Sequence, residues 1–466
     1  MISTPSQGSS KEHFDSPAPS DYWHSLLRSD VELQPKFCGD FSREMRSRKL
    51  TFGDRIHCPF LRPFFLTERD EARIRKVAES IAVFGERVVR AALESPELLK
   101  QLGLSDAEER LVRLDPGYAT ASTASRLDAF LLPESIQCAE YNAESPAGLG
   151  YSETLSAVFK EFDVMRSFQS KFAVRTYPLI ESILAALLAS YKDWGGTAKP
   201  PQIAIVDWRE VPTWSEFQIL RDRFDAAGVP TVVADPRDLH WDGSVLTAGP
   251  HKIDLVYRRV LINDILARPN ECSALMKAYE ARGVCVANTF QCKIPHKKAF
   301  FSVLTDERNQ SLFSAEELAL IHEHIPWTRV VSESHTTHEG RSIDLIGYIR
   351  EGHEHLVIKP NDEYGGAGVV LGWESSESDW ERAIETALKD PPGTWVTQER
   401  IAVRREVFPF FDAEGRVTMR EMLVDLAPYL FRGKLAGFLT RLSGTSLANV
   451  TSGGGQVPSF VVSPVS

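Results

Sequence analysis

The stretch HLVIKPNDEYGGAGVVLGWE, residues 355–374, predicts a hairpin with a charged, glycine-rich tip. The apolar run 356–358 is typical of a short buried strand, and the run 369–371 is typical of a returning strand. Between them lie a lysine, two acids and three glycines. Such a tip either simply turns the chain or binds phosphate. Phosphate binding is possible because the backbone N–H groups of glycines can approach phosphate oxygens closely.

Lys359 directly follows the buried strand, where a lysine must reach outward or find an anion. Glu363 lies four residues later and is expected to face the same mouth, next to Gly365 and Gly366. These four residues form a candidate phosphate site. A tight hairpin with a surface lysine is the alternative, and the hairpin alone does not exclude it.

The bulk composition is that of an acidic globular protein. The chain has 466 residues, enough for two or three domains, and a net charge of −11, which argues against binding to nucleic acid or anionic membranes. No apolar run has the length of a membrane helix, and no secretory signal is evident, so we expect a cytoplasmic protein. The six cysteines form no CxxC pair and are expected to be reduced, without zinc.

The pattern along the chain predicts an α+β protein with an inserted α/β domain. Residues 1–22 are expected to be a disordered tail, and residues 23–110 an N-terminal helical region. Residues 111–198 begin with strand-like pieces and are expected to return to helix over 153–195. Residues 199–292 alternate strands and helices as in a parallel α/β domain. Residues 293–466 follow with a helix, the hairpin, another helix and long antiparallel strands.

A second candidate site lies on a predicted strand near residue 140. Glu140 and Asn142 alternate along it and therefore point to the same face. A carboxylate beside an amide oxygen suits Mg²⁺, although a polar strand face is equally common. Upstream, Arg126 could clamp a carboxylate with its planar fork or simply pair with Asp128.

Two further segments have less specific signals. In WVTQERI, residues 395–401, a strand passes into a linker that could offer backbone groups to a purine edge; an ordinary strand end is the alternative. In the run 437–462, Arg441 lies at a strand end, and Gly453 and Gly454 belong to a loop that could close over a ligand. A disordered tail is the alternative, but the apolar strand that follows argues for a loop held at both ends.

Together, and in this order, these segments resemble the circularly permuted ATP-grasp ligases. That branch includes eukaryotic glutathione synthetase and glutathionylspermidine-synthase-like proteins. The resemblance extends from about Arg126 to Val462. It implies a circularly permuted ATP-grasp fold in which 111–198 is the first part, 199–292 the substrate domain and 293–466 the nucleotide-binding part with its closing loop.

The resemblance also implies roles for individual residues. ATP would be held by Lys359 and by a second lysine, for which Lys298 is the candidate and its neighbour Lys297 the alternative. The other implied roles are adenine contact by Gln398, Glu399 and Ile401, phosphate contact by Gly365 and Gly366, closure by Gly453 and Gly454, Mg²⁺ binding by Glu140, Asn142 and Glu363, and binding of the substrate carboxylate and developing charge by Arg126 and Arg441.

The sequence departs from glutathione synthetase in two places. Ser443 stands where that enzyme has a lysine two residues after the strand arginine, and TSGGG replaces its alanine-rich loop. The substrates are therefore not expected to be γ-glutamylcysteine and glycine. No upstream Cys/His amidase arrangement is evident, which argues against a bifunctional glutathionylspermidine enzyme.

The function implied is ATP- and Mg²⁺-dependent ligation of a small-molecule or peptide carboxylate to an amine through an acylphosphate. The glutathione synthetase relatives also suggest a homodimer. Two other classes stay open: a small-molecule or carboxylate kinase, and a non-catalytic nucleotide-binding protein of the same fold. The ligase interpretation requires the segments near residues 140 and 360 to meet at one cleft.

Overall fold

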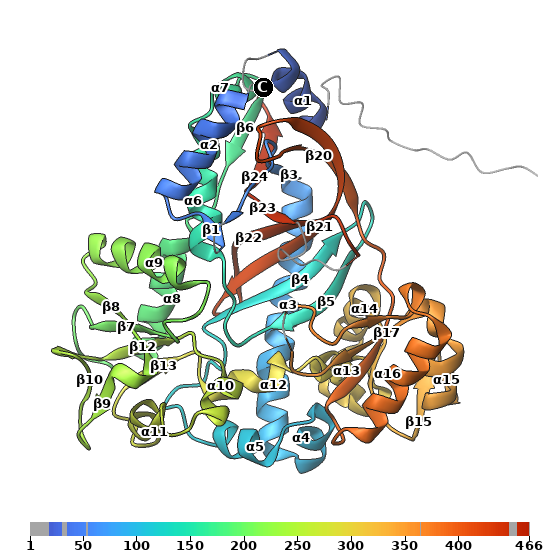
Figure 1. The fold of residues 1–466 in the computed structure, drawn as a ribbon. Coiled ribbons are helices and arrows are strands. Elements are labelled where there is room, and N and C mark those ends of the chain that lie inside the picture. The colour runs from blue at the N-terminus through green and yellow to red at the C-terminus, as the bar shows by residue number, and fades with distance from the viewer. Residues whose placement is uncertain (1–17, 30–34, 53–54, 364, 447–453, 466) are drawn as a thin grey trace, which may run out of the picture.

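The computed structural model describes residues 18–29, 35–52, 55–363, 365–446 and 454–465. They form a large central sheet with a parallel α/β layer on one side and a smaller antiparallel sheet on the other (Figure 1). One long helix, α3, passes behind the central sheet and reaches toward both flanking parts (Figure 1). The candidate site lies where the central sheet meets the smaller sheet.

The N-terminal region is mostly helical. Its elements are α1 (Pro19–Ser29), α2 (Pro35–Ser47), β1 (Thr51–Phe52), β2 (Arg55–Ile56), β3 (Phe64–Thr67), α3 (Glu68–Glu94), α4 (Pro96–Leu102) and α5 (Asp106–Val112). Thr67 caps α3 in a reciprocal capping box with Asp70. Ile74, Val77 and Ile81 lie on its buried face, as the helical spacing predicts. None of the helices in the described part of the chain is long and apolar enough to span a bilayer.

The central sheet joins strands from both ends of the chain. Its strands are β4 (Ala124–Leu131), β5 (Ile136–Asn142), β20 (Arg405–Phe411), β21 (Val417–Phe431), β22 (Lys434–Ser443) and β23 (Gly455–Val457). The order is β23-β22-β21-β4-β5, with β20 paired to the first half of β21. The second half of β21 is buried throughout, because α3 and α8 pack against the sheet. This order places the β4–β5 hairpin, which carries Glu140, beside the β21–β22 hairpin, which carries Arg441.

A second group of elements packs against strands β21, β22 and β23 of the central sheet. It consists of α6 (Leu149–Lys160), α7 (Asp163–Gln169), β6 (Phe172–Arg175), α8 (Leu179–Asp193) and β24 (Ser459–Pro464). Strand β24 pairs with β3 and β6, so the C-terminal strand is held between two segments of the first half of the chain.

The α/β layer contains a four-stranded parallel sheet of order β13-β12-β7-β8. Its elements are β7 (Ile203–Val206), α9 (Trp214–Ala226), β8 (Thr231–Ala234), β9 (Leu239–Trp241), β10 (Leu246–Ala248), β11 (His251–Lys252), β12 (Leu255–Arg258), α10 (Ile262–Ala267), α11 (Ser273–Glu280) and β13 (Cys285–Ala287). Alternate residues of β7 enter two different cores, Ile203 and Ile205 on one face and Ala204 and Val206 on the other. Burial on both faces explains the continuous apolar runs that predicted this layer.

The smaller sheet contains the hairpin. This part consists of α12 (Lys293–His296), α13 (Ala299–Thr305), α14 (Ala315–His324), β14 (Thr328–Val330), β15 (His335–His338), β16 (Arg341–Asp344), α15 (Leu345–Glu351), β17 (Leu356–Pro360), β18 (Val370–Leu371), α16 (Glu377–Lys389) and β19 (Trp395–Glu399). Strands β17 and β18 pair as predicted, with Ile358 opposite Val370. Helices α15 and α16 cover one face of the sheet, where Ile349, Ile384 and Trp380 meet Ile358.

Two local expectations differ from the structure. Helix α1 begins at Pro19, inside the range predicted as tail, because Trp23 is buried and donates a hydrogen bond to the Leu61 carbonyl. The helix expected through the 153–195 region is interrupted by β6, since pairing with β24 overrides the local helical pattern there. Residues 1–17 lie outside the described part, and the domain boundaries themselves stay predictions.

A close backbone contact joins the N-terminal helices to the smaller sheet. Gly103 ends α4 in the left-handed conformation, at φ +70°. A Cβ at this position would lie 2.2 Å from the Gly393 carbonyl oxygen and 2.8 Å from Asn361 Nδ2. Asn361 in turn donates to the carbonyls of Leu102 and Gly393.

Gly103→Ala is expected to destabilise the protein more than a left-handed glycine in open space would. Gly228→Ala is the matched control, because Gly228 has φ +81° and no atom within 4 Å of its Cβ position. Backbone strain alone predicts a loss of about 1–2 kcal/mol for Gly228→Ala, and at least about twice that for Gly103→Ala. Free energies of unfolding from denaturant titration measure both, and equal losses would show that the Gly103–Gly393 contact is unimportant.

Candidate functional site

A pocket lies between the central sheet and the smaller sheet. Strands β4, β5, β21 and β22 supply one side, and β17, β19 and the hairpin tip supply the other. The predicted residues that line it are Glu140, Lys298, Lys359, Glu363, Gly365, Gly366, Gln398, Glu399, Ile401 and Arg441. The segments near residues 140 and 360 therefore meet at one cleft, as the interpretation of the sequence requires.

Lys359 is a buried cation at the end of β17. Its Nζ donates to the Ala139 carbonyl, at 3.1 Å, and to Gln398 Oε1, at 2.7 Å. Burial lowers the pKa of Lys359 to about 8; Glu140 partly opposes this, and Lys298 adds to it. Since both hydrogen-bond acceptors are neutral, an anion bound in the pocket would stabilise the charged form of this side chain.

The structure separates the two neighbouring lysines. Lys298 lines the pocket, where its Nζ lies 3.4 Å from Glu140 Oε2 and donates to the Glu363 carbonyl. Lys297 points the other way and forms ion pairs with Glu108, at 2.8 Å, and Asp362, at 2.7 Å. Lys298 is therefore the lysine available to a ligand in the pocket.

Charged side chains cluster on the face of the central sheet that borders the pocket. Asp128 pairs in register with Glu140, and Asp425 pairs with Arg441. The Arg441 guanidinium bridges the two aspartates, with Nη2 2.6 Å from Asp128 Oδ2 and 2.5 Å from Asp425 Oδ2. Arg126 Nε donates to Asp128 Oδ1 at 2.9 Å.

The two aspartates have opposite pKa shifts. Burial alone would raise the pKa of Asp128, but Arg126 and Arg441 together bring it well below its usual range. Burial raises the pKa of Asp425 to about 6, because Arg441 compensates it only in part and the Asp128 charge opposes its ionisation. Neither aspartate was predicted from the sequence as a site residue. For Asp425 the available signal was a single acid within the apolar run MLVDLAPYLF.

Several predicted residues do not line the pocket. Arg126 is buried, and its guanidinium is held by Asp128 and the Ala147 carbonyl, so the simple ion pair is the observed alternative. Asn142 shares the face of Glu140 but lies two residues further along the strand, outside the pocket lining. Gly454 is buried beside Arg55, which donates to its carbonyl, and Gly453 lies outside the described residues.

One end of the pocket is apolar. Its walls include Val357, Leu371, Ile401 and Val403. Strand β19 ends at Glu399 and the chain continues without regular structure through Arg404, as expected for a linker beside a planar ligand. The side chains of Gln398 and Glu399 are engaged within the protein, Gln398 by Lys359 and Glu399 by His338.

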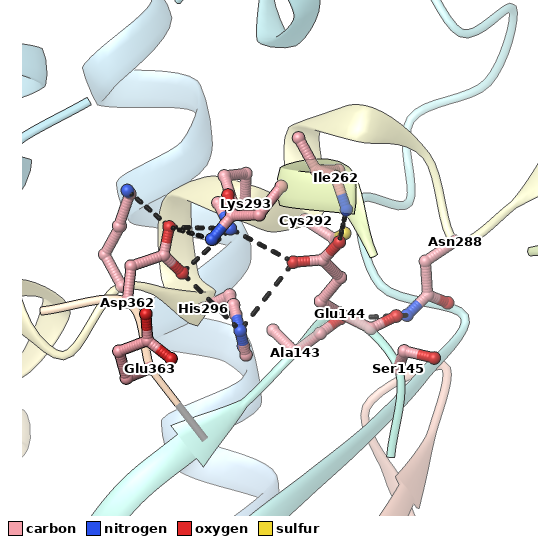
Figure 2. Close-up of polar contacts among 12 residues, drawn as sticks. Ala143, Glu144, Ser145, Ile262, Asn288, Cys292, Lys293, His296, Asp362 and Glu363 are labelled. Carbon is pink, nitrogen blue, oxygen red and sulfur yellow. Dashed lines mark hydrogen bonds and ion pairs between the residues drawn. The ribbon is translucent and has the colours of Figure 1, made fainter. Parts of the chain in front are cut away.

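A buried network of charges surrounds Asp362, next to the pocket residue Glu363 (Figure 2). Asp362, the neighbour of Glu363, accepts hydrogen bonds from Lys293, at 2.8 Å, and from Lys297, at 2.7 Å. Lys293 also lies 3.3 Å from Glu144 Oε2. Figure 2 shows Lys293 between the two carboxylates, with His296 beside them.

The network joins separate parts of the chain. Glu144 follows β5 and also pairs with Arg258 at the end of β12, 3.1 Å away. Burial alone would raise the pKa of Glu144, but Lys293 and Arg258 lower it to about 2. Lys293 and Lys297 likewise bring the pKa of Asp362 far below its usual range against the effect of burial. The hairpin tip is thus tied to α12, to β5 and to the α/β layer.

Two walls of the pocket each carry a carboxylate that could bind a divalent cation. Glu140 and Glu363 both line it and offer oxygen ligands, which suit a hard cation such as Mg²⁺. In the part of the chain that the structure describes, no three His, Cys, Asp or Glu side chains are grouped closely enough to form a complete protein metal site. A cation here would need ligands from a bound molecule or water as well.

Comparisons with known proteins are consistent in the fold they indicate. A model of the family described as circularly permuted ATP-grasp type 2 matches residues 134–443. A glutathione synthetase-like effector from Globodera pallida, solved in its apo form, superposes with a TM-score of 0.59 at 12% identity. That match covers 96% of this chain and 98% of the solved chain, so the shared fold extends over nearly the whole molecule.

Relatives by sequence are distant and longer. An uncharacterized protein of Mycobacterium tuberculosis is 24% identical over 347 residues, which is 70% of this chain and 57% of the relative. The chain thus spans little more than half the length of that relative. A Frankia casuarinae protein with the provisional name glutamate–cysteine ligase 2-2 is 21% identical over 297 residues, covering 60% of this chain and 32% of its own length.

Asp362→Asn is expected to destabilise the protein by roughly 3–5 kcal/mol at pH 7, because it removes a carboxylate from two buried lysines. The depressed pKa values of Asp362 and Glu144 stabilise the fold above pH ~4.5, and this stabilisation is lost as the pH falls toward 2. The variant should therefore lose less stability on acidification than the wild type. Denaturant titrations between pH 7 and pH 3 measure both effects.

The control for this experiment is Glu381→Gln, which breaks the exposed ion pair with Arg350. Little change in unfolding free energy is expected from it, since water and salt screen exposed pairs. If Asp362→Asn behaved like Glu381→Gln, the buried network would not hold the hairpin.

Proposed function

The chain belongs to the circularly permuted ATP-grasp type 2 family, and from this premise we propose that it is an ATP-dependent carboxylate–amine ligase. The family match confirms the predicted resemblance and the α+β fold class with permuted ATP-grasp order. The observation that supports the reaction is the pocket itself. It brings Lys298, Lys359 and the glycine-rich tip together with Glu140 and Arg441 from the other half of the chain.

The chemistry requires activation of the carboxylate. A carboxylate does not react with an amine directly, because oxide would have to leave. Transfer of the terminal phosphoryl group of ATP gives an acylphosphate; the amine then attacks the acyl carbon, the C–O bond to phosphate breaks and phosphate leaves with the electron pair. Such a reaction needs placement and charge neutralisation more than a protein nucleophile.

Two cations of the pocket suit the phosphates of ATP. Lys359 is buried with neutral hydrogen-bond acceptors, and Lys298 reaches the same space from the start of α13. In this proposal Arg441 meets charge that develops on the transferred group, while the apolar end takes the adenine ring. Glu140 and Glu363 would hold Mg²⁺, which when bound neutralises phosphate charge.

The substrates belong to the class of amino acids or small peptides. The name of the Frankia relative, which refers to joining glutamate to cysteine, supports this class for the present chain. The acidic character of the protein also argues against a nucleic-acid polymer as the substrate.

Hydroxylamine trapping tests the proposed reaction even while the amine substrate is unidentified. Purified protein is incubated with Mg²⁺, ATP and panels of amino acids and dipeptides, with and without hydroxylamine. ADP and a hydroxamate are expected to form together for at least one carboxylate. Accumulation of a stable phosphorylated product without hydroxylamine would instead indicate a kinase, and ATP binding without ADP from any panel would indicate a non-catalytic protein.

Lys359→Gln is expected to weaken ATP binding about 10–100-fold at pH 7, since it removes a charge-assisted hydrogen bond in a buried site. In the wild type, Lys359 is charged below its pKa of about 8, so affinity should fall as the pH rises above 8. The variant should lack this dependence. Calorimetric titration with ATP and Mg²⁺ between pH 7 and pH 9 measures it.

Lys389→Gln provides the matched control, because Lys389 is exposed on α16 and pairs with Glu385 outside the pocket. Its affinity for ATP should equal that of the wild type. Unchanged affinity in Lys359→Gln would contradict the placement of the nucleotide.

A further inference from the structure

We propose that Asp425 receives the amine substrate: its free carboxylate oxygen holds the amino group and accepts a proton from it as the amide bond forms. This inference rests on the proposed ligase function and deepens it, because it assigns the position of the second substrate. It also identifies the chemical class of that substrate as a primary or secondary amine that is cationic in water.

The position of Asp425 carries the inference. The residue lies on β21 directly opposite Arg441 of β22, lines the pocket and is 1% exposed. Arg441 Nε and Nη2 both contact Oδ2, each at 2.5 Å. Oδ1 is buried and has no hydrogen-bond partner among the described residues. A buried carboxylate oxygen without a donor is costly, and a ligand that donates there removes the cost.

Asp128, in the same cluster, accepts hydrogen bonds at both of its carboxylate oxygens. Arg126 donates to its Oδ1 and Arg441 to its Oδ2. Asp128 therefore positions the two arginines, whereas Asp425 shares only one oxygen with Arg441. Of these two paired aspartates, Asp425 alone keeps an acceptor for a ligand.

The surroundings of Asp425 suit proton transfer. The charged groups that face it are Arg441 on β22 and Asp128 and Arg126 on β4. Burial, only partly offset by Arg441, raises the pKa of Asp425 to about 6, so the group is mostly ionised at neutral pH yet more basic than an ordinary aspartate. A general base works best with a pKa near the operating pH.

The proposed step balances. An ammonium group has no lone pair, so it binds Oδ1 as a donor and gives one proton to that oxygen at the start of amide-bond formation. The nitrogen lone pair then forms the C–N bond while the C–O bond to phosphate breaks, and phosphate takes the electron pair. The remaining surplus proton of the nitrogen goes to the departing phosphate or to solvent.

Asp425→Asn separates this role from simple support of Arg441. Its amide oxygen can still accept from Arg441, but the side chain cannot take a proton. With the carboxylate identified by trapping, the variant should form hydroxamate within a few-fold of the wild-type rate, because hydroxylamine is already neutral at pH 7. Amide formation with an alkyl amine should fall about 10²–10⁴-fold and lose the wild-type rise in rate around pH 6. Equal losses with both nucleophiles would overturn the proposal.

A second measurement does not need turnover, and so distinguishes failure of this proposal from failure of the ligase function. In protein labelled with [¹³C]carboxyl aspartate, the Asp425 signal is identified by its absence in Asp425→Asn. Methylammonium should shift this signal above pH 6, while tetramethylammonium, which cannot donate a hydrogen bond, should not. Glu421→Gln, an exposed change on the same strand, should leave the response intact. A signal that methylammonium does not move overturns the proposal whether or not ligation is observed.

Discussion

The pairing of Asp362 with Lys293 and Lys297 is the interaction on which the pocket depends. Asp362 lies in the hairpin tip, and the two lysines lie at the start of the part that contains the smaller sheet. Through Lys293 the tip is tied to Glu144, which follows the Glu140 strand, and through Glu144 to Arg258 of the α/β layer (Figure 2). Because these charges are buried, none can be removed without leaving another uncompensated, so the three parts keep one arrangement.

This arrangement gives the two walls of the pocket different electrostatic characters. The hairpin wall presents Lys359 and Lys298, whereas the sheet wall presents aspartates neutralised in part by Arg441. An anionic phosphate chain suits the first wall, and a cationic amine suits the free oxygen of Asp425 on the second. The site can thus hold partners of opposite charge a short distance apart, as the proposed ATP-driven condensation requires.

A site residue could be predicted from the sequence where its signal lies within a few consecutive residues. Lys359, Glu363 and the glycines share one turn of chain, so their order alone placed them together. Asn142 and Arg126 have the right residue types, but the depth of each along its strand relative to the smaller sheet decided that they stay outside the pocket. Only the structure distinguishes Lys298 from Lys297, because Asp362 and Glu108 form ion pairs with Lys297.

The sequence by itself determined the elements: apolar periodicity defined the α/β layer and α3, and the lysine–glycine tip identified a phosphate-type hairpin. Only the tertiary structure decided which distant side chains share one space. Asp425 and Asp128 are far apart in the chain and meet because β21 pairs with β4, a contact that no local pattern specifies. The physical reason is that local propensity acts over a few residues, whereas burial and the pairing of charges are settled by whatever segments the whole fold brings together.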